Sequence, residues 1–190
     1  MSAPRIAAVV LAAGGSTRMR RPKALLQLDG ESFVLRVARV AGEAGFSPVV
    51  VVAGEEIGAI REAVAPVRAV ENVEWREGLA SSIRAGIASV AAECDAALLL
   101  LADQPLVSAA HLRELARAFA DGSDPVATAY GRRRGVPAIF GSRWFDELRA
   151  LTGDRGARDL LEREAARTFG DGDPPFDVDT PEDYERLRKR

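Results

Sequence analysis

The sequence predicts an α/β fold: a mostly parallel, Rossmann-like sheet with helices on both faces, in a three-layer α/β/α arrangement. Short apolar runs alternate along the chain with amphipathic stretches of helical period, which is the pattern of repeated strand–helix units. The runs at residues 49–52 and 98–101 are continuously apolar. Strands of that kind are buried on both faces, as in a parallel sheet between two layers of helices.

Each element follows from its local pattern. Strands are predicted at the short apolar runs, which are residues 6–11, 48–53, 67–70, 96–102, 125–130, 136–140 and 167–169. Helices are predicted where apolar residues recur every three or four positions, at residues 32–44, 56–64, 81–92, 108–120, 142–151, 157–163 and 181–189. Ser32 can cap the first helix, Gly45 closes it, and Pro181 suits the first turn of the last. Ligands of such sheets bind beyond the carboxyl ends of the strands, so the loops after Leu11, Ala53, Val70 and Ala102 are expected to carry chemistry.

Length and composition indicate one domain spanning residues 1–190, with 47% hydrophobic and 28% charged residues. The net charge of -2 argues against a general nucleic-acid or membrane-surface binder, which would carry a basic excess. No run approaches the ~18 apolar residues of a membrane span, and the N-terminal residues lack a signal-peptide pattern, so we expect a cytoplasmic protein. With one cysteine, Cys94, and one histidine, His111, an internal disulfide and multi-histidine metal sites are excluded. His111 is expected to be exposed at a helix start.

The loop after the first strand has the composition of a triphosphate-binding loop. Small residues let backbone amides approach an anion closely, and cations then add charge. The small residues and cations are Ala12, Ala13, Gly14, Gly15, Arg18, Arg20, Arg21 and Lys23. The loop is neither a Walker A loop, because no Gly-Lys-Ser/Thr ends it, nor a dinucleotide fingerprint, because the G-x-G-x-x-G spacing is absent. Arg18 could grip the outer phosphates in a two-pronged contact and Lys23 the inner one.

Acidic residues in two distant segments are candidates for a magnesium site. Asp103 follows the strand at 96–102 directly, at the ligand-binding edge of the sheet. Mg²⁺ usually takes one or two carboxylates together with substrate phosphates. Asp177 and Asp179 alternate around Val178, so both point the same way in an extended segment and either could supply the second carboxylate. The simpler interpretations are a turn residue for Asp103 and helix capping by Thr180 at the second segment.

Two further loops lead into predicted helices. Asn72 opens a segment that contains Trp75 and reaches Ser81 and Ser82, whose hydroxyls could bind a base or phosphate; ordinary capping by Ser81 is the alternative. Residues 153–158 place two arginines near a helix start, where cations are unfavourable unless an anion is present. That conflict favours an anion site, although exposed arginines are common.

These motifs follow one another along the chain, each occurring once. They are Leu-Ala-Ala-Gly with Arg18-Met19 and Lys23, Asn-x-x-Trp-x-x-Gly at residues 72–78 with Ser81-Ser82, Asp103-Gln104-Pro105, Gly135-Val136-Pro137, Gly-Asp-x-Gly-Ala-Arg at 153–158, and residues 177–183. The chain resembles the molybdenum cofactor nucleotidyltransferases, and most of all their cytidylyltransferase branch, over about residues 6–187. It departs at Arg20, where the family often has glycine, and at Val136, where histidine is more usual.

The resemblance implies a nucleotidyltransferase fold of the nucleotide-diphospho-sugar transferase type, and transfer of CMP from CTP to the phosphate of a molybdopterin-type molybdenum cofactor, with release of pyrophosphate. Mg²⁺ is the implied cofactor, and an apo molybdenum hydroxylase is a possible recipient of the product. The implied catalytic residues are Arg18, Lys23 and Asp103. The implied nucleotide-binding residues are Leu11, Ala12, Ala13, Gly14, Gly15, Asn72, Ser81 and Ser82, with Arg18 and Lys23. The implied substrate-binding residues are Gly135, Pro137, Gly153, Asp154, Gly156 and Arg158, and the implied metal ligands are Asp103 and Asp179 or Asp177.

Alternatives remain at this level. GTP could replace CTP, another phosphorylated compound could be the acceptor, or the chain could deliver the cofactor without catalysis. A nicotinamide oxidoreductase is a weak alternative, because the dinucleotide fingerprint is absent.

Overall fold

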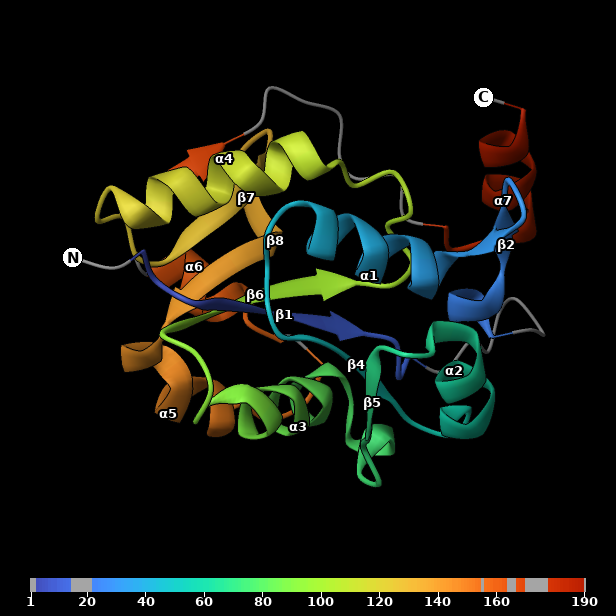
Figure 1. Cartoon of the computed structure of the whole chain (residues 1–190), viewed down its shortest axis with the longest axis horizontal. Helices are drawn as coiled ribbons and strands as arrows, with labels where there is room; N and C mark the ends of the chain where they lie inside the picture. The colour runs from blue at the N-terminus through green and yellow to red at the C-terminus, as the bar shows by residue number, and fades with distance from the viewer. Residues whose placement is uncertain (1–2, 15–21, 155, 164–166, 170–177, 190) are drawn as a thin grey trace.

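A seven-stranded mixed sheet forms the centre of the protein. The computed structural model describes residues 3–14, 22–154, 156–163, 167–169 and 178–189. The sheet has the order β5-β4-β1-β6-β8-β7-β9 (Figure 1). Its strands are β1 (Ile6–Leu11), β4 (Val49–Ala53), β5 (Arg68–Glu71), β6 (Ala96–Leu101), β7 (Val126–Tyr130), β8 (Arg133–Gly141) and β9 (Arg167–Phe169). Within the sheet, only β8 runs antiparallel to its neighbours.

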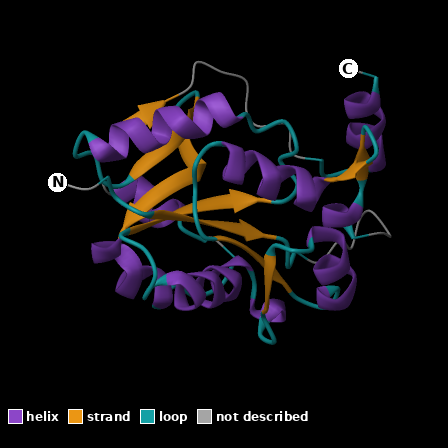
Figure 2. Ribbon diagram, in the orientation of Figure 1, coloured by secondary structure: helices purple, strands orange, loops and turns teal. Residues whose placement is uncertain are grey.

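Helices cover both faces of this sheet (Figure 2). They are α1 (Phe33–Glu43), α2 (Ile57–Val64), α3 (Leu79–Val90), α4 (Ala109–Ala120), α5 (Phe145–Arg149), α6 (Arg158–Arg163) and α7 (Pro181–Arg188). Ala8 and Val10 of β1 face a core shared with α1, α2 and α4, whereas Ala7 and Val9 face a second core shared with α3, α5 and α6. The predicted three-layer α/β/α fold is therefore confirmed.

The neighbouring parallel strands end level with one another. Leu11 pairs with Val52 of β4 on one side and with Leu101 of β6 on the other. The pairing continues past the strand ends, because Ala12 N donates to Val52 O at 2.8 Å and Ala102 N donates to Leu11 O at 3.0 Å. The loops that follow these strands therefore start side by side at one edge of the sheet, as the parallel arrangement predicted.

Most predicted elements are present, with shifted ends. Ser32 accepts from Leu35 N as the cap of α1, and Gly45 has φ +98° just beyond its end. Three expectations were wrong in detail. Helix α3 begins at Leu79 rather than at 81; β8 begins at Arg133 rather than at 136, because its N-terminal half pairs with β7; and the helix expected at 142–151 is a 3₁₀ turn, η3 (Ser142–Trp144), followed by α5.

A small satellite unit lies beside the main sheet, and the sequence pattern predicted its helix but not its hairpin. The chain after β1 forms a 3₁₀ turn, η1 (Lys23–Leu25), and a hairpin of β2 (Gln27–Leu28) and β3 (Glu31–Ser32). Helix α7 packs on this hairpin through a cluster that consists of Leu26, Leu28, Phe33, Val178 and Leu187, with Tyr184 at its border. In Figure 1, α7 and β2 lie together on the side toward which the arrowheads of β1 and β6 point.

None of the helices in the described residues is long and apolar enough to cross a membrane.

Replacement of Gly86 by alanine should destabilise the protein by about 1–3 kcal/mol, because α3 lies against the sheet at this point. A Cβ at Gly86 would lie 2.3 Å from Val9 Cγ1 and 3.1 Å from Val52 Cγ2, both in the buried strands. The same substitution at Gly58 is a matched control. Gly58 is an exposed helical residue whose added Cβ would meet nothing within 4 Å, so alanine there should stabilise by about 0.4–1 kcal/mol. Urea unfolding measures both changes, and equal shifts of the midpoint in one direction would contradict the expected close approach.

Candidate functional site

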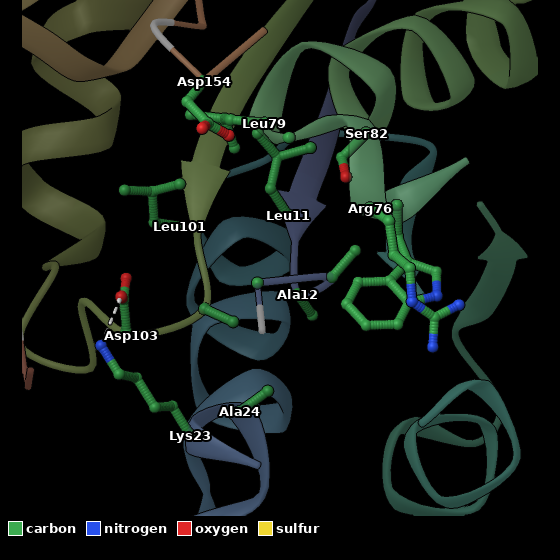
Figure 3. Close-up of a pocket in the computed structure, with 15 residues that line it drawn as sticks. Leu11, Ala12, Lys23, Ala24, Arg76, Leu79, Ser82, Leu101, Asp103 and Asp154 are labelled. Atoms are coloured by element: carbon green, nitrogen blue, oxygen red, sulfur yellow. Dashed lines mark ion pairs between the residues drawn. The ribbon is translucent and has the colours of Figure 1, made fainter. Parts of the chain in front are cut away.

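A pocket opens at the carboxyl ends of β1 and β6, where the fold predicts a ligand (Figure 3). Its volume is about 580 Å³. The lining residues come from the end of β1 and the loop after it, the turn η1, a 3₁₀ turn η2 (Trp75–Glu77), the start of α3, the end of β6 and the loop after it, and the loop before α6. They are Leu11, Ala12, Ala13, Gly14, Lys23, Ala24, Trp75, Arg76, Gly78, Leu79, Ser82, Leu101, Ala102, Asp103 and Asp154. A pocket of this size accommodates a nucleotide-sized ligand.

Charged side chains from three distant segments meet at one side of the pocket. Lys23 Nζ donates a hydrogen bond to Asp179 Oδ1 at 2.5 Å and lies 3.9 Å from Asp103 Oδ2. Figure 3 shows Lys23 and Asp103 pointing toward each other on one side of the pocket. The lysine side chain is 19% exposed, while those of Asp103 and Asp179 are 28% and 56% exposed. Two of the predicted metal ligands and a predicted phosphate contact are therefore adjacent.

The satellite unit positions Asp179 at this site. Val178 is fully buried, and its backbone N–H donates to Asp103 O at 3.3 Å. On the other side of Asp179, Thr180 begins α7 with a capping box: its side chain accepts from Asp183 N, and the Asp183 carboxylate accepts from Thr180 N. Thr180 thus caps the helix as predicted, and Asp179 is held between two anchored residues.

Asn72 and Ser81 support the pocket wall rather than line it. Asn72 is 4% exposed, and its Nδ2 donates to Ser81 Oγ at 2.9 Å and to Ser82 Oγ at 3.0 Å. Ser81 Oγ donates in turn to Gly78 O at 2.8 Å. Capping of the helix by Ser81 was a wrong interpretation, because the cap position is Gly78. Of these three predicted nucleotide contacts, Ser82 alone lines the pocket.

A close approach between two loops fixes the start of α3. Gly78 has φ +105°, and a Cβ built there would lie 2.0 Å from Asp154 Oδ1. Ala80 N donates to Gly153 O at 3.1 Å, which joins the same two loops by their backbones. Asp154 therefore reaches the pocket, whereas Gly153, Gly156 and Arg158 are not among the lining residues. Arg158 instead lies 3.9 Å from Glu162 on α6.

Trp75 and Arg76 form the opposite wall, which sequence reasoning did not identify as a wall of the site. The Arg76 guanidinium lies 4.2 Å from the centre of the Trp75 ring, and Glu55 Oε1 is 3.8 Å from Arg76 Nη2. Gly54 allows this arrangement, because a Cβ there would lie 2.5 Å from the Trp75 ring. Such an amphipathic aromatic wall is suited to a planar ligand. The feature of the sequence that could have indicated this wall is Gly54, a residue without a side chain directly after β4.

Gly135 and Pro137 lie in the first half of β8, outside the set of pocket-lining residues. A side chain of β7 holds the backbone of Pro137, and a side chain of α4 contacts that side chain in turn. Thr128 Oγ1 donates to Pro137 O at 2.8 Å and therefore accepts from His111 Nε2 at 2.7 Å. The expectation of an exposed His111 was wrong, because this contact holds the ring against β7 with only 20% of its side chain exposed.

His111 predicts a specific loss of stability in mild acid. Burial lowers the pKa of its imidazole below the usual 6.5, and Glu114 only partly opposes this effect. The unfolded chain then binds a proton that the folded chain does not, so the free energy of unfolding should fall as the pH drops below about 6.5. Urea unfolding at pH 7.5 and 5.5 measures the loss. His111→Gln, which cannot titrate, should show a smaller loss, and an equal loss in both proteins would contradict the assignment.

Three of the predicted site residues, Gly15, Arg18 and Asp177, lie outside the described residues. Among the residues that the structure does describe, no group of three or more His, Cys, Asp or Glu could hold a metal ion by itself. The donor set is instead a pair of carboxylates that already shares one cation, Lys23. Two carboxylate oxygens completed by substrate phosphates suit Mg²⁺, which seldom occupies an all-protein cage.

Comparison with known proteins assigns the family. Residues 8–168 match the model of the MobA-like NTP transferase domain. The chain belongs to this family. The predicted resemblance and fold type are therefore confirmed, and at this level the protein is a nucleotidyltransferase of the MobA-like type.

Proteins similar to this chain carry different names. The purine catabolism protein PucB of Bacillus subtilis (strain 168) is 31% identical over 100% of this chain and 98% of its own. The nicotine blue oxidoreductase of Paenarthrobacter nicotinovorans is 32% identical over 97% of both chains. The probable molybdenum cofactor guanylyltransferase of Opitutus terrae is 36% identical over 68% of both.

Two solved structures are also similar to this chain. The crystal structure of Rv0371c from Mycobacterium tuberculosis H37Rv superposes with a TM-score of 0.85 at 35% identity, covering 98% of this chain and 99% of that one. The same protein in complex with manganese has a TM-score of 0.81 at 32% identity, covering 97% and 98% of the two chains.

Proposed function

We propose that this MobA-like protein transfers CMP from CTP to the phosphate of a molybdopterin-type molybdenum cofactor and releases pyrophosphate. The observation that carries the proposal is the meeting of Lys23, Asp103 and Asp179 at the edge of a nucleotide-sized pocket. These groups come from three segments far apart in sequence, and none of them is needed to complete the hydrophobic core. Their arrangement fits neutralisation of a metal-bound triphosphate.

The reaction needs little covalent chemistry from the protein. A phosphate oxygen of the acceptor attacks the α-phosphorus of the nucleotide, the bond between the α-phosphorus and its bridging oxygen breaks, and pyrophosphate leaves with the electron pair. The attacking phosphate is already anionic at neutral pH, so no strong general base is required. Catalysis then rests on the alignment of two anionic substrates and on neutralisation of the developing charge.

We assign a separate role in this reaction to each group of residues. Asp103 and Asp179 would hold a divalent ion, which supplies positive charge to the triphosphate oxygens. Lys23 neutralises further phosphate charge from the same side of the pocket, and we assign the same task to Arg18. Residues Leu11 to Gly15 would hold the nucleotide, and Ser82 lines the same pocket. The second wall, made of Trp75 and Arg76, offers a face for a planar ring.

The donor base is the finer part of the proposal. The resemblance of the whole motif set to the cytidylyl branch supports CTP, because Leu-Ala-Ala-Gly alone occurs beside several bases. GTP is the competing donor, because one relative is named a guanylyltransferase. An apo molybdenum hydroxylase is the proposed recipient of the product.

Release of pyrophosphate from each of the four ribonucleoside triphosphates tests the proposal. Purified molybdopterin-type cofactor is the acceptor, Mg²⁺ is the metal, and the mass of the product identifies the base and the acceptor. We expect the cytosine dinucleotide product and no pyrophosphate without the acceptor. A guanine product would correct the donor alone, whereas no pyrophosphate with any nucleotide and this acceptor would refute the proposed transfer.

The name of one relative, a nicotine blue oxidoreductase, favours a second candidate: reduction of a dye-like substrate by a reduced nicotinamide. The sequence that follows β1 contains Gly14-Gly15 without the G-x-G-x-x-G spacing that cradles a dinucleotide pyrophosphate. Incubation of the protein with a reduced nicotinamide and the dye should leave the nicotinamide absorbance unchanged, and a steady decrease would favour the oxidoreductase.

A further inference from the structure

Lys23 is within ion-pair distance of both carboxylates that are proposed to bind the metal. Its ammonium lies 2.5 Å from Asp179 Oδ1 and 3.9 Å from Asp103 Oδ2. A divalent ion bound by the same two carboxylates needs the space and the electrostatic attraction that the ammonium now has. Without a cation between them, the carboxylates of Asp103 and Asp179 would repel each other, because both lie within 4 Å of the position that the ammonium occupies.

The elements around Lys23 hold it in place. The residue begins the 3₁₀ turn η1, and the next residue, Ala24, is buried against the core under α1. Asp103 follows the buried strand β6, and Asp179 is held by the Val178 and Thr180 anchors. The lysine and its two partners therefore come from three separately fixed pieces of backbone.

The geometry points to Lys23 as an exchangeable counter-ion that couples metal binding to nucleotide binding; this inference rests on the proposed function. A divalent ion that enters alone must take both carboxylates from the ammonium. A triphosphate that enters with the ion offers the ammonium new anionic oxygens in the same pocket, which Lys23 also lines. The metal and the triphosphate should therefore bind cooperatively, and the coupling should act equally in both directions.

Replacement of Lys23 by methionine separates this role from general electrostatics. Methionine keeps an unbranched side chain of similar length but removes the competing charge. We expect Lys23→Met to bind Mn²⁺ at least about tenfold more tightly than the wild type in the absence of nucleotide, since coupling between sites typically amounts to 5–150-fold. Mn²⁺ is the probe because a relative was crystallised with it, and the free ion is counted by electron paramagnetic resonance.

Two variants serve as controls. Arg76→Met removes another positive charge from the pocket lining, on the side away from Lys23 and Asp103 in Figure 3, and should leave Mn²⁺ affinity without nucleotide unchanged. Lys23→Met combined with Asp179→Asn should lose the gain, because one of the two carboxylates is then neutral. Thermal melting checks that each variant is folded, and Lys23→Gln replaces Lys23→Met if the latter does not fold.

A second measurement adds a non-hydrolysable α,β-methylene analogue of CTP. Its phosphate oxygens should tighten Mn²⁺ binding to both proteins, but the factor should be about 5–150-fold larger for the wild type than for Lys23→Met. Unchanged or weaker Mn²⁺ binding by Lys23→Met without nucleotide would overturn the inference. If that variant gains Mn²⁺ affinity but the wild type transfers no nucleotide, the exchange stands and the proposed transfer fails, so the two failures are distinguishable.

Discussion

Asp103→Asn should lower the rate of nucleotidyl transfer by about 10²–10³-fold, the usual cost of losing one well-placed electrostatic group. The substitution keeps the shape of the side chain but removes the charge that the proposed metal requires. It also weakens the attraction to Lys23, which lies 3.9 Å away. The side chain is partly exposed, so the loss of this ion pair should cost at most about 1 kcal/mol of stability.

Steady-state pyrophosphate release and urea unfolding test this prediction together. Asp146→Asn is the matched control: it removes the same charge from a 97% exposed side chain on α5, and Figure 1 shows α5 at the end of the sheet away from the arrowheads of β1 and β6. We expect the control to have wild-type rates. Near-normal turnover of Asp103→Asn would remove Asp103 from the metal site, and a collapse of its stability would show that the residue is structural.

Gly78→Ala should reduce both stability and activity. The residue has φ +105°, which residues with a side chain rarely adopt, and its added Cβ would lie 2.0 Å from Asp154 Oδ1. Backbone strain of about 1–3 kcal/mol and overpacking of similar size predict a total loss of about 2–5 kcal/mol. Relief of the contact would displace Asp154 and the first turn of α3, which carries Ser82 into the pocket.

Gly122→Ala isolates the part due to strain. Gly122 has φ +92°, but a Cβ there would meet nothing within 4 Å, and the residue lies beyond the end of α4. Alanine at this position should cost only the strain energy and should not change turnover. The double variant Gly78→Ala with Asp154→Ala should recover part of the lost stability, since the contact partner is removed. Equal costs at Gly78 and Gly122 would show that the contact with Asp154 is unimportant.

The sequence predicted the main sheet well because its strands are buried on both faces. Continuous apolar runs such as 98–101 have no alternative location in a folded chain, and β1 and β9 have the predicted bounds. The hairpin of β2 and β3 was missed because two-residue strands are too short to show alternation. Its turn nevertheless has a signal, Asp29-Gly30, with φ +53° and +81° as the hairpin turn requires.

The site was predictable to the extent that the sheet edge determines it. Asp103 and the loop after β1 could be placed because parallel strands end together. The position of Asp179 could not be derived from the residues around it, because it depends on how α7 packs against the hairpin of β2 and β3. These elements are far apart in the sequence: Tyr184 Oη donates a hydrogen bond to Gln27 O, 157 residues earlier. The supporting role of Asn72 depends likewise on the exact start of α3, which the sequence pattern placed two residues too late.

The small cluster beneath α7 has a consequence for heat inactivation. Asp179 depends on the satellite unit, and the cluster that holds this unit is separate from the two cores beside the main sheet. Local opening of such a small unit requires less free energy than unfolding of the whole chain. On gentle warming, activity should therefore be lost at a temperature at which the circular dichroism of the sheet and its helices is still native. A designed crosslink between α7 and the hairpin should raise the temperature of activity loss to the temperature at which the whole chain unfolds.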